Sequence, residues 1–422
     1  MSSLDVAGVT GVRVQEPNHE PSAAGSIERS TMPSPRTRSG WIRRIGIVLV
    51  ACLAPILPVT ANADAHPEPV TDWSRAVVDS TMKRFTPATL GSWGYQTGLY
   101  LYGQYLVYKR THDQAYLDYI KAWVDRFVDA NGKVSNSFNS LDSMQSGNLL
   151  VLLYQETKDP RYQKAAAQIR TRLTTYPRTS DGGFWHATSR QHQLWLDGTY
   201  MVLPFLERYG AAFNDSAYAD KEAAQQLVTY GSHLSDPSGF FWHAYDESGT
   251  QTWADPTTHH SPEFWCRSIG WYAMASVDVL DYTPRSDPNR AKIVTNVRNL
   301  AKAIRKYQDP KTGRWFQVPE KPTLAGNWTE TSCSAMFTYT LSKAVQKGYL
   351  DHSYQSVAER GYRGVLAQVS VGSDGLTTIA DICIGTNVGD TAFYLARPRA
   401  TNDPHGLGAF LIMNEQLRGT GL

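Results

Sequence analysis

The chain has 422 residues, of which 41% are hydrophobic and 19% are charged, and this composition excludes an intrinsically disordered protein. Lys+Arg number 41 and Asp+Glu 39, so the chain lacks the clustered basic excess of a nucleic-acid-binding surface. The four cysteines are too few and too scattered to predict a disulfide framework or a metal site. Twelve Trp, 23 Tyr and 13 Phe favour a ligand with flat apolar faces, such as a sugar.

Residues 1–65 are predicted to be a leader that precedes the folded domain. Arg43 and Arg44 come before an apolar run over residues 45–59, and small residues follow at positions 61–63. A basic start, a short apolar stretch and a small-x-small end are typical of a secretory signal peptide. The apolar run is short for a membrane-spanning helix, so we expect no stable membrane span after cleavage.

The signal peptide, near residues 41–63, predicts a secreted or periplasmic protein. Cys52 leaves lipoprotein anchoring open as a second interpretation, although apolar residues rather than a polar tether follow it. Met1 and Met32 are both open as the start of the protein.

Residues 66–422 are predicted to be one catalytic domain built from a repeat. A short loop with Asp, Gly and usually an aromatic residue recurs, and each copy separates an amphipathic stretch from a more apolar one. The amphipathic stretches, which predict helices with one buried face, are 72–85, 113–128, 159–175, 216–234, 288–307 and 351–370. The apolar stretches, which predict helices buried on every side, are 94–110, 142–156, 197–210, 265–281, 330–347 and 405–417. The alternation predicts an all-α fold, an (α/α)6 barrel of six inner and six outer helices, with short hairpins in the mouth loops.

The alternation also predicts where a ligand binds. All inner helices should run in one direction, so their N-terminal ends and the loops before them gather at one end of the barrel, the mouth. Small residues early in the inner helices would let them approach one axis closely: Gly98, Gly147, Gly198, Gly270, Ser334 and Gly408. Most tryptophans fall in the mouth loops or the first inner turns, namely residues 93, 185, 195, 242, 253, 265, 271, 315 and 328. This clustering predicts a sugar-binding cleft at the mouth.

Two aspartates at the predicted mouth are candidates for acid–base chemistry. Asp142, followed by Gln145, also fits a helix capping box, and Asp197 also fits an ordinary cap before Gly198. The apolar residues 194–196 would raise the pKa of Asp197 by burial. A carboxylic acid that is neutral near pH 7 is suited to general acid catalysis.

Two further polar residues lie in aromatic surroundings. His243 fits either a structural, hydrogen-bonded histidine or a ligand-binding one. Arg267 is a permanent cation in an almost apolar helix start, so it needs an anionic partner. That partner is either an inner carboxylate or an acidic substrate, and a single arginine among tryptophans favours recognition of one carboxylate, as on a uronic acid.

At these residues the sequence resembles glycoside hydrolase family 88/105, the unsaturated uronyl hydrolases, and most closely the unsaturated rhamnogalacturonyl hydrolases of family 105. The resemblance covers about residues 70–417. The segments that carry it are Trp93–Tyr95, Leu141–Asp142, Gly183–His186, Gln193–Met201, Trp242–His243, Trp265–Trp271, Glu330–Met336 and His405–Phe410.

The resemblance implies hydration of a 4,5-unsaturated uronic acid at the non-reducing end of a lyase-generated, pectin-type oligosaccharide. Asp197 would protonate C4 and then deprotonate the water that adds at C5, after which the hemiketal opens and the sugar is released. Asp142 would hold sugar hydroxyls and help to set the protonation of Asp197, because interacting carboxylates titrate as a pair. The residues implied to bind the unsaturated ring are Tyr95, His243, Trp265 and Arg267. No cofactor and no metal are implied, and the expected partner is an acidic oligosaccharide.

Three other functions remain open from the residues alone. An inverting glycosidase on a saturated uronic-acid-containing oligosaccharide would use the two aspartates as base and acid. A sugar epimerase or lyase would take a ring proton with His243 or a tyrosine. A secreted sugar-binding protein would need no catalyst. The resemblance implies lysine at position 187, where this chain has Ala187, so the sugar next to the unsaturated ring is open, as is the oligomeric state.

Overall fold

The computed structural model describes residues 71–418. The predicted leader, with its signal peptide near residues 41–63, lies outside the described residues. The chain divides into two units, residues 1–66 and 67–422, and the fold below is that of the second. Within residues 71–418, no helix is both long enough and apolar enough to cross a membrane.

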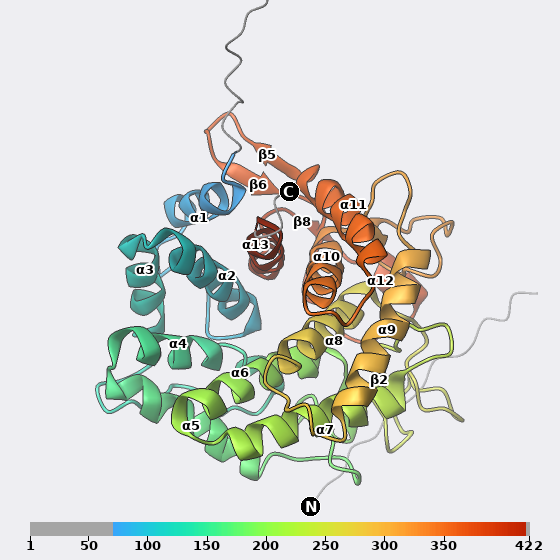
Figure 1. The fold of residues 1–422 in the computed structure, drawn as a ribbon, viewed down its shortest axis with the longest axis horizontal. Helices are drawn as coiled ribbons and strands as arrows, with labels where there is room; N and C mark the ends of the chain where they lie inside the picture. The colour runs from blue at the N-terminus through green and yellow to red at the C-terminus, as the bar shows by residue number, and fades with distance from the viewer. Residues whose placement is uncertain (1–70, 419–422) are drawn as a thin grey trace, which may run out of the picture. The chain divides into compact units, whose positions relative to one another are not determined.

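The helices form two concentric layers (Figure 1). The outer layer consists of α1 (Trp73–Arg84), α3 (Gln114–Val124), α5 (Pro160–Thr174), α7 (Ser216–Leu234), α9 (Arg290–Lys306) and α11 (Gln355–Leu366). The inner layer consists of α2 (Tyr95–Thr111), α4 (Gly147–Thr157), α6 (Asp197–Phe213), α8 (Cys266–Val279), α10 (Thr331–Gln346) and α13 (Pro404–Arg418). The predicted (α/α)6 barrel is confirmed, because each inner helix contacts the next and α13 closes the ring against α2.

Burial follows the pattern that the sequence predicts. In α8 every residue from Cys266 to Val279 is buried, whereas α9 buries only one face, with Ile293, Val297, Leu300 and Ile304 at helical spacing. A helix can be buried on all sides only if small residues allow close neighbours. A Cβ added at Gly408 of α13 would lie 2.6 Å from the carbonyl carbon of Leu99 in α2.

Short antiparallel strand pairs lie in the loops between the helices. They are β1 (Gln193–Trp195) with β2 (Ala244–Asp246), β3 (Trp315–Phe316) with β4 (Thr329–Glu330), β5 (Val369–Val371) with β6 (Thr377–Ile379), and β7 (Ile382–Cys383) with β8 (Arg399–Ala400). The pair β1–β2 joins two different mouth loops, with Leu194 opposite Tyr245, so this β-structure is not the local hairpin that the sequence suggested. It ties the start of α6 to the loop before α8.

Three helices end or begin away from their predicted boundaries, and one of them is α3, which ends at Val124 rather than at residue 128. The outer helix expected over 351–370 is a 3-10 turn, His352–Tyr354, followed by α11, and its last residues form β5 instead; Val369 and Val371 are β-branched and suit a strand. The inner helix expected from residue 142 begins only at Gly147, because a separate 3-10 turn, Leu141–Ser143, precedes it.

The sequence did not predict the disulfide that the structure shows. Cys266 and Cys333 are bonded across 67 residues of chain, and they join the N-terminal ends of the neighbouring inner helices α8 and α10. Cys383 is a buried free thiol, in agreement with the odd number of cysteines after the leader.

Candidate active site at the mouth of the barrel

A cavity of about 230 Å³ opens among the mouth loops. Of the predicted site residues, Tyr95, Asp142 and Asp197 line it. The other three predicted residues, His243, Trp265 and Arg267, are buried and lie behind this lining. The remaining lining residues are Ser140, His186, Ala187, Arg190, Trp195, Met201, Thr386 and Asn387.

Asp142 does not cap a helix. It lies in the 3-10 turn Leu141–Ser143, where the side chain of Ser140 accepts the hydrogen bond from the backbone N–H of Ser143. The capping box with Gln145 that the sequence allowed is therefore absent. The carboxyl group of Asp142 faces the cavity, with its Oδ2 atom 3.8 Å from Nε2 of His186.

Asp197 is not a cap either. The strand β1 ends at Trp195, and Asp197 is the first residue of α6, whose N-cap is Leu196 without a side-chain hydrogen bond. Its Oδ2 atom lies 3.1 Å from Nε2 of His243. Both structural interpretations of the aspartates are thus excluded, and two carboxyl groups are left to face one cavity.

A chain of hydrogen bonds runs from Asp197 into the protein. Nδ1 of His243 lies 2.7 Å from the hydroxyl oxygen of Tyr394, and the backbone N–H of Gly389 donates to that same oxygen at 3.2 Å. Burial lowers the pKa of His243 and raises that of Tyr394, so the ring is neutral and the phenol protonated near pH 7. Tyr394 then donates to Nδ1, and Nε2–H of His243 donates to Asp197.

The pKa values of the two aspartates are displaced in opposite directions. Burial raises the pKa of Asp142, and the nearby Asp197 adds to the rise against the opposing effect of His186. Burial would also raise the pKa of Asp197, but the hydrogen bond from His243 and the neighbouring His186 and Arg267 outweigh it, so the pKa is lowered.

The predicted rise in the pKa of Asp197 was therefore wrong for the free protein. The apolar neighbours at 194–196 were identified correctly, since all three are buried. The donor on His243, 46 residues away, was not visible as a partner. Of the two aspartates, Asp142 is the one that favours the proton, and Asp197 favours the carboxylate.

Arg267 has backbone partners rather than a carboxylate in hydrogen-bonding contact. Its guanidinium donates to the carbonyl oxygen of Cys383 and, at 2.7 Å, to that of Ile384, and Nη1 also lies 3.0 Å from Nε2 of His405. The residue is 1% exposed. Of the two partners that the sequence left open, an inner carboxylate is not in hydrogen-bonding contact, and recognition of a substrate carboxylate stays a prediction. The carbonyl partners belong to the loop that carries Thr386 and Asn387, which Arg267 holds against the site.

Trp265 lies behind the cavity wall, whereas Tyr95 is part of that wall. Trp265 is 1% exposed, and its ring packs against His243 at a centroid distance of 4.7 Å and against Tyr394 at 5.8 Å. It therefore supports the hydrogen-bond chain rather than lining the cavity. Tyr95, at the start of α2, lines the cavity itself, and burial holds its hydroxyl protonated by raising the pKa.

Several residues of the cavity wall were not among the individual site residues that the sequence predicted, although Trp195 belongs to the tryptophan cluster that predicted the cleft. Trp195 stacks on His186 with centroids 4.4 Å apart and planes within 9°, and Arg190 lies over the Trp195 ring. The aromatic motifs before Ala187 and before Asp197 were the available signal for His186 and Trp195. No pattern pointed to Thr386 and Asn387.

Glu330, the first residue of one of the segments that carry the resemblance, has a structural role. It is fully buried at the N-cap of α10 and accepts from the backbone N–H groups of Ser332 and Cys333. It also accepts from the backbone N–H of Cys383. These bonds describe a structural cap, which anchors the 383–387 loop.

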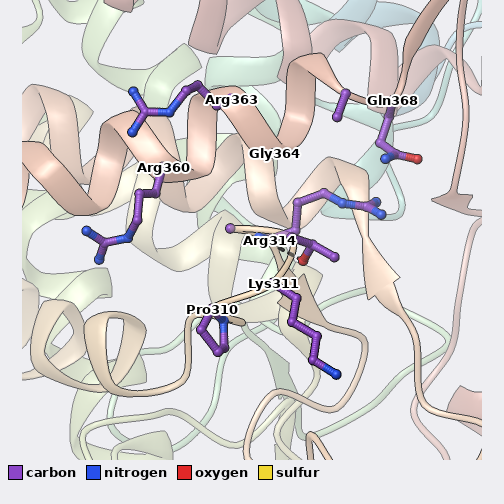
Figure 2. Close-up of a pocket in the computed structure, with 10 residues that line it drawn as sticks. Pro310, Lys311, Arg314, Arg360, Arg363, Gly364 and Gln368 are labelled. Atoms are coloured by element: carbon purple, nitrogen blue, oxygen red, sulfur yellow. Dashed lines mark hydrogen bonds between the residues drawn. The ribbon is translucent and has the colours of Figure 1, made fainter. Parts of the chain in front are cut away.

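Another cavity, of about 460 Å³, lies between residues 310–314 and α11. It is basic, but no acidic or aromatic side chain lines it. Figure 2 shows the guanidinium groups of Arg360 and Arg363 pointing to the side opposite that of Arg314. These cations do not converge on one ligand position, so the mouth cavity is the better candidate for chemistry.

Comparisons with known proteins agree with the geometry. The family model described as Glycosyl Hydrolase Family 88 matches residues 73–418. A solved glycoside hydrolase of family 105 from C. acetobutylicum ATCC 824 is 32% identical with a TM-score of 0.79, over 83% of this chain and 100% of that one. Protein Atu3128 of Agrobacterium fabrum is 31% identical over 50% of this chain and 96% of its own length.

A further relative carries a functional name. The unsaturated rhamnogalacturonyl hydrolase YesR of Bacillus subtilis is 25% identical over 62% of this chain and 73% of its own length. The family match spans the whole barrel, including every residue of the mouth cavity. The chain therefore belongs to glycoside hydrolase family 88/105, the unsaturated uronyl hydrolases.

Proposed function

We propose that the chain releases the 4,5-unsaturated uronic acid from the non-reducing end of lyase-generated rhamnogalacturonan oligosaccharides by hydrating the C4=C5 double bond. The observation that carries this proposal is the pair Asp142 and Asp197, which face one cavity with oppositely displaced pKa values. Such a pair holds one proton over a range of pH and so provides an acid and a base together. The relationship to YesR supports the rhamnogalacturonan substrate.

The raised pKa of Asp142 and the lowered pKa of Asp197 favour Asp142 as the holder of the shared proton. A bound substrate brings its own carboxylate into the cavity and displaces water, and both effects raise the pKa of Asp197. Asp197 therefore takes up a proton, from Asp142 or from solvent water, as the substrate binds. Asp197 then protonates C4, positive charge develops at C5 and the ring oxygen, and water adds at C5 as Asp197 takes back a proton. The hemiketal opens and the leaving sugar departs. Tyr95 binds the ring, His243 orients Asp197, and Trp265 and Arg267 support them from behind.

The test follows the conjugated double bond. We expect the protein to remove the ultraviolet absorbance of an unsaturated rhamnogalacturonan disaccharide, whereas a saturated galacturonate analogue should not be cleaved. Absence of turnover with every unsaturated uronyl oligosaccharide would refute the proposal. Cleavage of the saturated analogue would instead support an inverting glycosidase.

We further propose that the enzyme is exported and that cleavage follows residues 61–63. Intact-mass measurement of the protein secreted by an expressing host tests this. The expected mass is that of a chain that begins near Asp64. A mass that corresponds to a lipid-modified Cys52 would contradict the proposal.

A further inference from the structure

The cavity at the mouth has room for one sugar ring. Its volume of about 230 Å³ lies below the range of roughly 300–1,000 Å³ that is typical of pockets for larger ligands. Under the proposed function, the unsaturated ring fills this space beside Asp142 and Asp197. The sugar on the other side of the cleaved bond must then lie at the rim.

Arg190 is the only lysine or arginine among the described residues that line this cavity. The backbone around it is fixed: its N–H donates to the carbonyl of Ala187 at 2.9 Å, and its carbonyl accepts from Gln193 at 3.2 Å. The side chain is exposed. Within residues 71–418, its guanidinium makes no hydrogen bond or ion pair, and it lies over the Trp195 ring, 5.4 Å from the centroid.

The surface beneath Arg190 is rigid. The indole N–H of Trp195 donates to Oε1 of Gln193 at 2.9 Å, and the ring stacks on His186. Ala187, which also lines the cavity, has too short a side chain to occupy the space. A held aromatic ring beside a guanidinium with unused donors is a suitable platform for a sugar, which offers an apolar face and several hydroxyl acceptors.

We infer that Arg190 is a specificity-determining residue that binds the leaving sugar at the rim of the cavity. This inference rests on the proposed function. It assigns Arg190 to the second sugar alone, so its effect must depend on whether the leaving group is a sugar.

The experiment compares two substrates, the unsaturated rhamnogalacturonan disaccharide and the methyl glycoside of the 4,5-unsaturated galacturonic acid. For Arg190→Ala we expect kcat/KM on the disaccharide to fall about tenfold, through KM, since a hydrogen bond from a charged donor is lost. On the methyl glycoside kcat/KM should stay within about twofold. Arg399→Ala is the matched control, because Arg399 is also exposed and lies 4.6 Å from the ring of Trp328 but does not line the cavity.

The outcomes separate the two proposals. Turnover of the disaccharide by the unchanged enzyme tests the proposed function, and if neither substrate reacts, both proposals fall. Equal losses on both substrates would place Arg190 on the unsaturated ring and overturn the inference. No loss on either substrate would also overturn it, because Arg190 would then contact neither sugar productively.

Discussion

The two ends of the barrel both bury charge, but they treat it differently. At the end opposite the mouth, Lys343 of α10 lies 2.7 Å from Asp278 and 2.8 Å from Asp281, and Tyr339 donates to Asp278 as well. At the mouth, the ion-pair partners of Asp142 and Asp197 within residues 71–418 are the histidines His186 and His243, and both carboxyl groups line the cavity. Lys343 thus neutralises Asp278 and Asp281 at the closed end, whereas neither mouth aspartate forms an ion pair with a lysine or an arginine of the described residues.

The pKa directions reflect this difference. Burial alone would lower the pKa of Lys343, but Asp278 and Asp281 outweigh it and the pKa is raised, so Lys343 stays charged at neutral pH. At the mouth, burial raises the pKa of Asp142, whereas hydrogen bonding and nearby charges outweigh burial at Asp197 and lower its pKa. A buried carboxylate is thus a structural group or a reactive one according to the partner that reaches it.

The largest expected effect is on activity at the mouth. Asp197→Asn should lower kcat/KM on the unsaturated disaccharide by about a thousandfold, since the amide cannot transfer the proton. The loss of ultraviolet absorbance measures the rate, and circular dichroism should show an unchanged fold. Near-normal turnover would show that Asp197 does not transfer the proton, and the contrast between a reactive mouth and a structural closed end would no longer hold.

The counterpart at the closed end should affect stability alone. Lys343→Met leaves the buried Asp278 without its cation, so the free energy of unfolding should fall by about 3–5 kcal/mol. Denaturant titration measures the fall. At 25 °C the folded variant should keep kcat/KM within about twofold. A large change in kcat/KM would mean that the two ends are coupled.

A smaller effect is expected behind the mouth. Tyr394→Phe removes the donor to Nδ1 of His243, which weakens the preference for a proton on Nε2 and so the bond that lowers the pKa of Asp197. The acid limb of the kcat/KM profile should move to higher pH, with a loss of about fivefold to tenfold at the optimum and little change in KM.

The control is Tyr272→Phe, which removes another buried hydroxyl, one that donates to the carbonyl of Leu227. It should lower stability without moving the pH profile. Identical pH profiles of kcat/KM for the two variants would show that Tyr394 contributes only packing.

The smallest effect is a gain in stability at the mouth. The pKa of Asp142 is raised in the folded state, so its contribution to stability is present below the unfolded pKa, about 3.9, and is lost as pH rises through the folded value. Asp142→Asn cannot ionise and should therefore raise Tm by on the order of 1 °C at pH 7, while activity falls. Scanning calorimetry at pH 7 and pH 4 measures the difference, which should shrink at the lower pH; a lower Tm at pH 7 would contradict the assignment.

The fold was predictable because its signal is periodic and local. Stretches that are apolar all round alternate with amphipathic ones, and that alternation alone defines two layers of helices. Glycines such as Gly408 showed where helices would crowd. The candidate site was predictable as far as the lining aspartates, Asp142 and Asp197, which stand beside aromatic motifs.

The rest depends on contacts between distant segments. The direction of the pKa shift of Asp197 depends on His243, and the partners of Arg267 are carbonyls more than a hundred residues away. The bond between Cys266 and Cys333 joins the N-terminal ends of α8 and α10, two helices that lie side by side only in the folded barrel. Thr386 and Asn387 come from an irregular segment between α11 and α13, where no periodicity marks a position.

The parallel course of the six inner helices has an electrostatic consequence. Each helix carries a macrodipole whose positive end, equivalent to roughly half a unit charge, lies at its N-terminus. In this barrel all six positive ends surround the mouth, as the starts of α2, α6 and α8 at Tyr95, Asp197 and Cys266 show. The backbone itself thus places a positive potential around an anionic ligand, so a chain with nearly equal numbers of acidic and basic residues can attract an acidic sugar without a basic surface.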